Sequence, residues 1–261
     1  DAVYTASTSD PFDERGIAAH VASAVGAEGD VAVADFQGSA RAATTAVLSA
    51  VDAIEGGRAE DALVVATDVR QADAGTSAEQ TAGAGAAALV LGADGDVASI
   101  DGSGTNTTGF VGRFQRAGGS PVPGDGRFNR ERYVEAVTGA LSGLGGLDDR
   151  ADHAALAAPD GRWGGRALSA AELDAEQHST FDAVGDAGAA SVLLDAVAAL
   201  ENAGAGEGVL VASFGPGGSD ALALTRGDAG NPDMTTQDYV DSKEYVTYAK
   251  HRAYRDAGGE A

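Results

Sequence analysis

The chain has 261 residues, 44% of them hydrophobic, and a formal net charge of −23 that comes from 40 acidic against 17 basic residues. This length is enough for an α/β domain with a sizeable core, and the hydrophobic content excludes an acidic disordered chain. The charge excludes nucleic acid as a natural partner, because phosphates would be repelled. Lysine occurs only at Lys243 and Lys250. An acid excess with so little lysine indicates a high-salt cytoplasm, where salt screens the carboxylates from one another.

The sequence contains no cysteine, which excludes disulfides, thiolate metal sites and cysteine nucleophiles. No apolar run approaches the ~20 residues of a membrane span, and we expect no signal peptide, a cytoplasmic location and no membrane partner. Residues 1–6 have the pattern of a strand that is already under way. We therefore expect that a strand and a helix preceding this point are missing from the sequence.

Short apolar runs bounded by Gly or Asp alternate with helical patterns along the chain. They predict strands at residues 31–36, 62–67, 86–91, 154–158, 209–213 and 221–224. Helical spacing predicts helices at residues 42–55 and 187–202, and Gly56 and Gly57 suit the end of the first. Residues 101–130 show no period and predict a long surface loop, which is followed by a helix over residues 130–147 and a polar, aromatic-bearing tail over residues 239–252.

The helices predicted at residues 42–55 and 187–202 resemble each other. A shift of 146 residues pairs Val47 with Leu193 and Val51 with Val197, and the register continues through the next strand. Any two alanine-rich helices followed by a strand can align by chance, but a register kept through helix, turn and strand favours a duplication. Small residues cover much of the first helix, as a helix placed between two sheets requires.

Residues 35–44 read Asp-Phe-Gln-Gly-Ser-Ala-Arg-Ala-Ala-Thr, a strand end that runs into a small-residue helix. This segment resembles the nucleophile turn of the 3-hydroxy-3-methylglutaryl-CoA synthase family, where a cysteine stands two residues before the Ala-Gly-Thr that continues the helix. Ala40 is at the matching position. Residues 3–12 resemble the strand and loop that carry the catalytic glutamate in the family, and Thr8 is at the position of that glutamate.

The other matches follow in the family's order. Residues 64–88 resemble its "SD…GD.LE…AAG.AA" stretch, 156–163 its His-x-Pro element, 184–191 its Gly-Asn element, 213–221 its "SYGSGAGSDA" segment, and 245–252 its "Y..Y...R" ending. Ala157 is at the catalytic histidine and Asp186 at the asparagine. The order and spacing of these segments identify the chain as a member of the archaeal-type branch of this family. The resemblance implies a thiolase-like, duplicated α-β-α-β-α layered fold with halves at residues 1–150 and 151–261, the first incomplete at its start.

Condensation of two acyl-CoA molecules needs an acylated nucleophile, a base, and an acid or base for the leaving group. The side chains of Thr8, Ala40 and Ala157 supply none of these, so we expect no intact catalytic set. Ser39 is the only hydroxyl beside Ala40, and the sequence shows no base to activate it. For substrate binding the resemblance implies a set around the nucleophile turn and the glycine-rich segment, namely Ser39, Arg41, Gly215, Gly217 and Ser219.

Three hypotheses follow from the resemblance. The first is a non-catalytic subunit that dimerises with itself or with a thiolase-fold paralogue and acts as a scaffold, since archaeal synthases assemble with a thiolase and a small OB-fold zinc-ribbon protein. The second is an active acyltransferase with a non-standard nucleophile. The third is a binder of CoA thioesters that uses no cofactor and holds the phosphates with Arg41, Arg113 or Arg116.

The four histidines, at positions 20, 153, 178 and 251, have no metal-ligand spacing in the sequence, so we expect no metal site. His153 lies four residues before Ala157 and is predicted to be a solvated loop residue at the entrance to a strand.

Overall fold

The computed structural model describes residues 1–12, 14–116 and 119–257. The strands are β1 Ala2–Ser7, β2 Ala32–Gln37, β3 Asp61–Val69, β4 Ala84–Gly92, β5 Ala98–Thr107, β6 Ala151–Leu156, β7 Glu176–Gln177, β8 Gly208–Gly215 and β9 Gly218–Arg226. The α-helices are α1 Ala18–Ala24, α2 Ala42–Glu55, α3 Ser77–Thr81, α4 Gly126–Ser142, α5 Trp163–Ala170, α6 Phe181–Val184, α7 Ser191–Asn202, α8 Thr236–Asp241 and α9 Tyr248–Ala257. Two 3-10 turns, η1 Asp148–Arg150 and η2 Gly188–Ala190, complete the elements.

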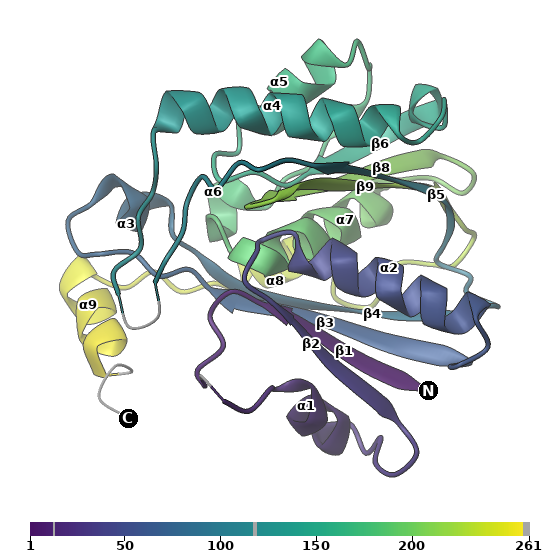
Figure 1. The fold of residues 1–261 in the computed structure, drawn as a ribbon, viewed down its shortest axis with the longest axis horizontal. Coiled ribbons are helices and arrows are strands. Elements are labelled where there is room, and N and C mark those ends of the chain that lie inside the picture. The colour runs from purple at the N-terminus through teal and green to yellow at the C-terminus, as the bar shows by residue number, and fades with distance from the viewer. Residues whose placement is uncertain (13, 117–118, 258–261) are drawn as a thin grey trace.

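Helices and sheets alternate in five layers (Figure 1). Helices α4 and α5 cover one face of a five-stranded sheet, α2 and α7 lie between that sheet and a four-stranded sheet, and α1 covers part of the far side. This arrangement confirms the predicted layered α/β class. It also places the ends of β2, β3 and β8 next to the start of α2, where the functional site is expected.

The two sheets repeat one topology. The first has the order β2-β1-β3-β4, and the second contains β7-β6-β8-β9 with β5 added outside β9. In both, the first three strands are parallel and the fourth is antiparallel to its neighbour, as the duplication predicts. Strand β5, which comes from the predicted first half, joins the second sheet outside β9.

The core between the sheets is built from small side chains. Helix α2 has the bounds predicted for it, and Ala43, Ala46 and Ala50 on it are completely buried. The predicted helix at residues 187–202 is η2 followed by α7. Alanine has the smallest side chain that still favours a helix, and a row of alanines lets two sheets approach α2 from opposite sides. The core therefore depends on close contact of backbones more than on large side chains.

The prediction of a surface loop at residues 101–130 is wrong for residues 101–107, because these residues belong to β5, which ends at Thr107. The glycines and serines that suggested a loop are there for packing. A Cβ atom at Gly104 would lie 2.1 Å from the carbonyl oxygen of Ala140 in α4, so glycine is needed where the helix crosses the strand. Helix α4 also begins earlier than predicted, with the Asp125 carboxylate accepting from the Phe128 amide at 2.9 Å as its N-cap.

The polar tail folds back across the molecule. Helix α9 lies beside α3 (Figure 1), and the Tyr248 hydroxyl donates to the Glu79 carboxylate at 3.0 Å. The Arg252 guanidinium contacts the same carboxylate at 3.3 Å, so two residues of the tail anchor it to α3. Within the part of the chain that the structure describes, no helix is both long and apolar enough to cross a membrane.

Candidate functional site

The turn between β2 and α2 forms the centre of the candidate site. Gly38 has a φ of +81°, which allows the chain to turn sharply after β2. Arg41 is the N-cap residue of α2, and no side chain caps the helix there. A Cβ atom at Gly215 would lie 2.4 Å from the Ser39 hydroxyl, so only glycine lets the end of β8 approach this turn so closely. The start of α2 is therefore held against the C-terminal end of β8.

Two cavities meet at this turn. The larger, of about 350 Å³, is lined by residues from α3, from the segment before α4 and from the end of β8. The smaller, of about 120 Å³, lies toward the end of β1. Ala40, Arg70, Arg113 and Pro216 line both. The volume of the larger cavity is within the range of small-molecule sites.

Arg70 joins two of the positions that the sequence singled out. Its Nε donates to the Asp186 carboxylate at 3.0 Å, and its Nη1 donates to the Thr8 hydroxyl at 3.2 Å. The Thr8 hydroxyl in turn donates to Asp68 at 2.7 Å, whose carboxylate also accepts from the Ala189 amide at 2.9 Å. Thr8 and Asp186, 178 residues apart in sequence, thus belong to one hydrogen-bonded group beside Ala40.

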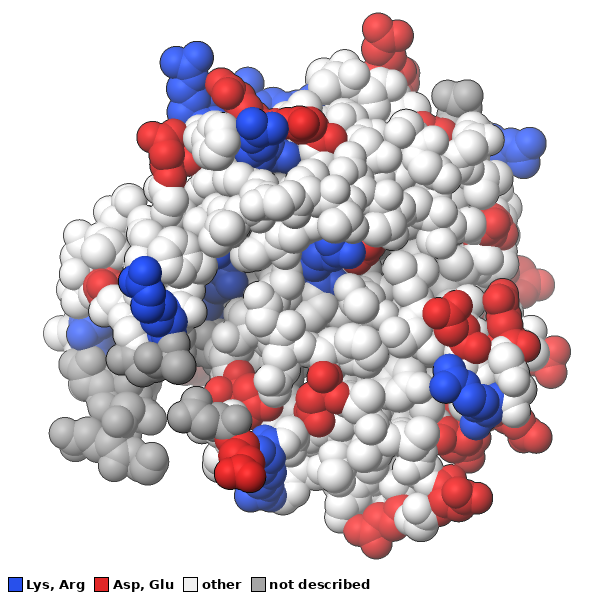
Figure 2. Space-filling view, viewed as in Figure 1, with Lys and Arg blue, Asp and Glu red and all other residues white. Residues whose placement is uncertain are grey.

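A second arginine lies at the same place. Arg113 donates to the Gln71 carbonyl oxygen, and burial lowers the pKa of its guanidinium, with the neighbouring charge of Arg70 adding to that effect. Asp68 and Asp186 oppose the effect. Two guanidinium groups at one small cavity are notable in so acidic a chain. On the face drawn in Figure 2, acidic and some basic side chains protrude around the edge, and further basic groups lie recessed near the middle.

Ala157, the fourth position, lies behind the cavities. It is buried in the core between the sheets, and its amide donates to the Ala212 carbonyl at 2.9 Å. Pro159 and Asp160, which follow it closely, line the larger cavity. The structure therefore brings Thr8, Ala40 and Asp186 to adjoining cavities and keeps Ala157 in the adjacent wall.

Ser39 and Arg41, two of the residues proposed for substrate binding, form hydrogen bonds with other parts of the protein. The Ser39 hydroxyl donates to the Pro216 carbonyl at 3.0 Å. Arg41 donates to both oxygens of Asp220, at 2.8 and 3.1 Å, and to the Gly217 carbonyl at 3.0 Å. Such a bidentate pair with a buried carboxylate fixes the guanidinium.

The glycine-rich segment, residues 213–221, contributes less surface to the two cavities than the sequence suggested. Ser219 lies in β9 with no exposed surface, and its hydroxyl donates to the Ser213 carbonyl at 2.6 Å. Gly215 lines the larger cavity. Gly217 has a φ of +96° in the turn between β8 and β9, where its carbonyl accepts from Arg41.

Arg70, Asp68 and Asp220 organise the site, and the sequence reading did not assign them a role. Asp68 and Asp220 lie in two of the segments that matched the family pattern. An acidic residue inside such an apolar segment indicates a buried carboxylate that needs a partner, and this signal could have singled them out. The prediction for His153 is also wrong. This residue lies in β6 and is 8% exposed, because its ring is on the same side of the strand as the core residue Ala155.

Comparison with known proteins agrees with the fold and with the order of the motifs. No family model matches the chain. The hydroxymethylglutaryl-CoA synthase of Methanopyrus kandleri is 30% identical over 264 residues, which are 96% of this chain and 75% of that protein. The synthase of Methanocaldococcus jannaschii is 29% identical over 268 residues, which are 97% of this chain and 77% of that protein.

Solved structures show the same architecture. A hydroxymethylglutaryl-CoA synthase complexed with CoA superposes with a TM-score of 0.83 and 18% identity, covering 97% of this chain and 71% of that one. The 3-oxoacyl-(acyl carrier protein) synthase III of Pseudomonas aeruginosa gives a TM-score of 0.72 and 21% identity, covering 89% and 78%. The identity and coverage of the archaeal relatives, together with the fold, show that the chain belongs to the hydroxymethylglutaryl-CoA synthase family of the thiolase superfamily.

Proposed function

We propose that this chain is a non-condensing member of its family that binds an acyl-CoA, or acts as a scaffold, in a complex that handles acyl-CoA. The observation that carries the proposal is Ala40. It stands at the start of α2 and lines both cavities, at the position where the family resemblance places the cysteine. A helix N-terminus lowers the pKa of a thiol there, but a methyl group has no proton to lose and cannot attack a thioester.

The groups around Ala40 do not replace the missing chemistry. Thr8 is hydrogen-bonded to Asp68 and Arg70, and a threonine hydroxyl is no base at neutral pH. Asp186 is paired with Arg70. Among the described residues, neither cavity is lined by a histidine. These observations support loss of condensation rather than a change of catalyst.

The alternative, an acyltransferase with a different nucleophile, would use Ser39. Activation of a serine requires a base within hydrogen-bond reach of its hydroxyl. The Ser39 hydroxyl instead donates to the Pro216 carbonyl, which cannot take up the proton. The non-condensing function is therefore the better supported of the two.

Binding of an acyl-CoA is supported by charge and size. Arg70 and Arg113 line both cavities, and the N-terminus of α2 adds a partial positive charge that favours anions. CoA is an anionic ligand that a surface of net charge −23 would otherwise repel. Arg41 is less suited to hold phosphates than Arg113, because Asp220 and Gly217 already occupy its guanidinium.

The test compares the wild-type chain with Ala40→Cys and with Ala40→Ser as a control of similar size. Each is incubated with acetyl-CoA and examined by intact mass and peptide mass spectrometry. We expect no acetyl adduct on the wild type or on Ala40→Ser, and an adduct at residue 40 of Ala40→Cys. An acetyl group on the wild-type chain, at Ser39 or elsewhere in the cavities, would overturn the proposal.

A dimer, with itself or with a catalytic paralogue, is the assembly we propose. Strand β2 is at the edge of the four-stranded sheet, with Val33 45% exposed, and pairing across a two-fold axis would cover it. Strand β3 offers no such edge, because it lies between β1 and β4. The family resemblance suggests an OB-fold zinc-ribbon protein as a further partner. We propose that this complex forms in a high-salt cytoplasm.

Light scattering in molar salt tests this assembly. We expect a dimer for the wild type and a monomer for Val33→Lys, which puts a charge on the edge of β2. Val90→Lys on β4, at the opposite edge of the sheet, is the matched control, because Val90 is also exposed. A wild-type monomer that keeps its native circular dichroism would refute the dimer.

A further inference from the structure

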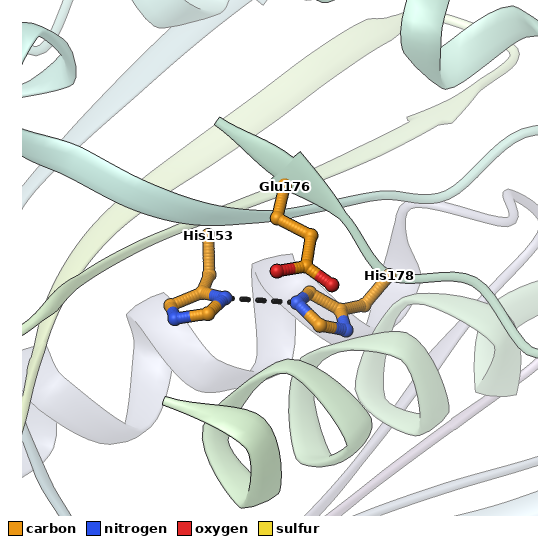
Figure 3. A group of neighbouring side chains, drawn as sticks. All are labelled: His153, Glu176 and His178. Carbon is orange, nitrogen blue, oxygen red and sulfur yellow. Dashed lines mark hydrogen bonds between the residues drawn. The ribbon is translucent and has the colours of Figure 1, made fainter. Parts of the chain in front are cut away.

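We propose that His153, Glu176 and His178 form a binding site for a divalent transition-metal ion of the zinc class. Each offers one ligand atom, and these atoms all lie within 4.8 Å of one another. Figure 3 shows the three side chains turned toward one another at the edge of the five-stranded sheet, next to a helix. Two imidazoles and one carboxylate are a common set of protein ligands for zinc.

The sheet register produces this set. Glu176 in β7 is directly opposite His153 in β6, and such cross-strand partners have their side chains on the same face. His178 lies two residues after Glu176, so it returns to that face. Its amide donates to the Ala154 carbonyl at 2.7 Å, which fixes it beside β6. Three ligands thus come from two short paired segments, and no long loop has to be ordered.

The hydrogen bonds orient the ligand atoms. The Nε2 atom of His153 is 3.0 Å from the Glu207 carboxylate, so the Nε2 proton is donated there and Nδ1 keeps its lone pair. A carboxylate behind a ligating histidine is the usual second partner in zinc sites. Glu207 is itself held by the Gly204 amide at 2.6 Å. This support for His153 is independent of the clustering of the three ligands.

The spacing of the nitrogens fits a metal. Nδ1 of His153 is 2.9 Å from Nε2 of His178, so in the metal-free protein a proton on His178 is donated to His153. Two nitrogens bound to one tetrahedral zinc are about 3.3 Å apart, given zinc–nitrogen bonds of 2.0–2.1 Å. A cation can therefore replace the shared proton after a small outward movement of the two rings.

The surroundings leave the set accessible. His153 is buried, Glu176 is exposed, and His178 borders a cavity of about 370 Å³ beside α7 and α8. Three protein ligands with an open side leave a position for water. Ala157 is four residues beyond His153, which corresponds to about 13 Å along a strand. A metal here would tie the two-residue edge strand β7 to β6, away from the cavities around Ala40.

The experiment must separate this site from unspecific attraction of cations to an acidic surface. The untagged chain is stripped with EDTA and titrated with Zn²⁺ in molar KCl with excess Mg²⁺, which carboxylates accept and imidazoles do not. Calorimetry gives stoichiometry and affinity, and Co²⁺ in place of Zn²⁺ gives a visible spectrum that reports nitrogen ligands. The variants are His178→Ala, Glu176→Gln and Glu207→Gln, with His251→Ala on the exposed side of α9 as the control.

We expect one equivalent of Zn²⁺ for the wild type and for His251→Ala. His178→Ala and Glu176→Gln should lose at least tenfold in affinity, and Glu207→Gln, which removes the support behind His153, about 10- to 100-fold. Glu176 is exposed, so its variant tests the site even if a histidine variant does not fold. The proposal is overturned if the wild type binds no Zn²⁺ under these conditions, or if Glu176→Gln and His251→Ala bind it equally well.

Discussion

Asp195 is a carboxylate inside the protein whose ionisation opposes folding. It lies on α7, and its Oδ1 accepts from the amide and hydroxyl of Thr180 at 2.7 and 2.8 Å. Burial raises the pKa of Asp195 to about 6, and the hydrogen bonds from Thr180 only partly offset this. The folded state binds the proton more tightly than the unfolded state. This group therefore stabilises the fold most at low pH, and its contribution is lost as the pH rises through about 6.

We predict that Asp195→Asn removes this dependence. Between pH 4 and 7 the free energy of unfolding of the variant should rise relative to wild type by about 2 kcal/mol. Urea unfolding at several pH values measures it, with the exposed Asp52→Asn on α2 as the control. A difference between Asp195→Asn and wild type that does not change with pH would contradict the prediction.

The sequence predicted some of the site residues but not the charged residues that hold them in place, Arg70, Asp68 and Asp220. Short motifs placed Thr8, Ala40 and Asp186, and these do lie at adjoining cavities. Arg113 was one of three arginines named as candidates to hold phosphates, but Arg70 was not separable from the other arginines, because only long-range packing decides which of them face inward. The His153, Glu176 and His178 cluster was hidden for a similar reason, since it depends on the register between β6 and β7, in which His153 pairs with Glu176, 23 positions further along the chain.

At the scale of elements, periodicity was reliable where a helix has a continuous apolar stripe. The bounds of α2 were predicted correctly because its alanines and valines repeat at helical spacing and glycines follow. The strand β5 was missed because its glycines make room for α4, a contact that the sequence does not display. The same composition can therefore indicate a loop or a tightly packed strand, and only the neighbouring element distinguishes them.

The position of α2 between two sheets leads to a prediction about its packing. Ala50 is completely buried, so Ala50→Leu has no space for the added carbons and should lower the free energy of unfolding by about 1–3 kcal/mol. Ala19→Leu on α1 is the control, because Ala19 is exposed and leucine is a good helix former. Chemical denaturation of both variants measures the effect. Equal stability of the two would show that the sheets can move apart around α2.

At the scale of the whole molecule, the net charge of −23 predicts that salt stabilises the fold. Repulsion among surface carboxylates is screened as the Debye length shortens from about 10 Å at 0.1 M to about 3 Å at 1 M. We expect the thermal unfolding midpoint to rise over this range of KCl and to respond much less to a neutral osmolyte that leaves ionic strength unchanged. A midpoint insensitive to KCl would mean that repulsion does not limit stability.

The attachment of α9 to α3 has a consequence for the larger cavity. Ser77, Ala78 and Thr81 of α3 form part of its wall, and the carboxylate that holds the tail, Glu79, belongs to the same short helix. If a ligand in this cavity strengthens the contact between α3 and α9, then by thermodynamic reciprocity a protein that binds α9 and strengthens the same contact raises the affinity for that ligand by the same factor. In that case α9 would couple the binding of an assembly partner to the binding of a small molecule in the larger cavity, although the two ligands do not touch.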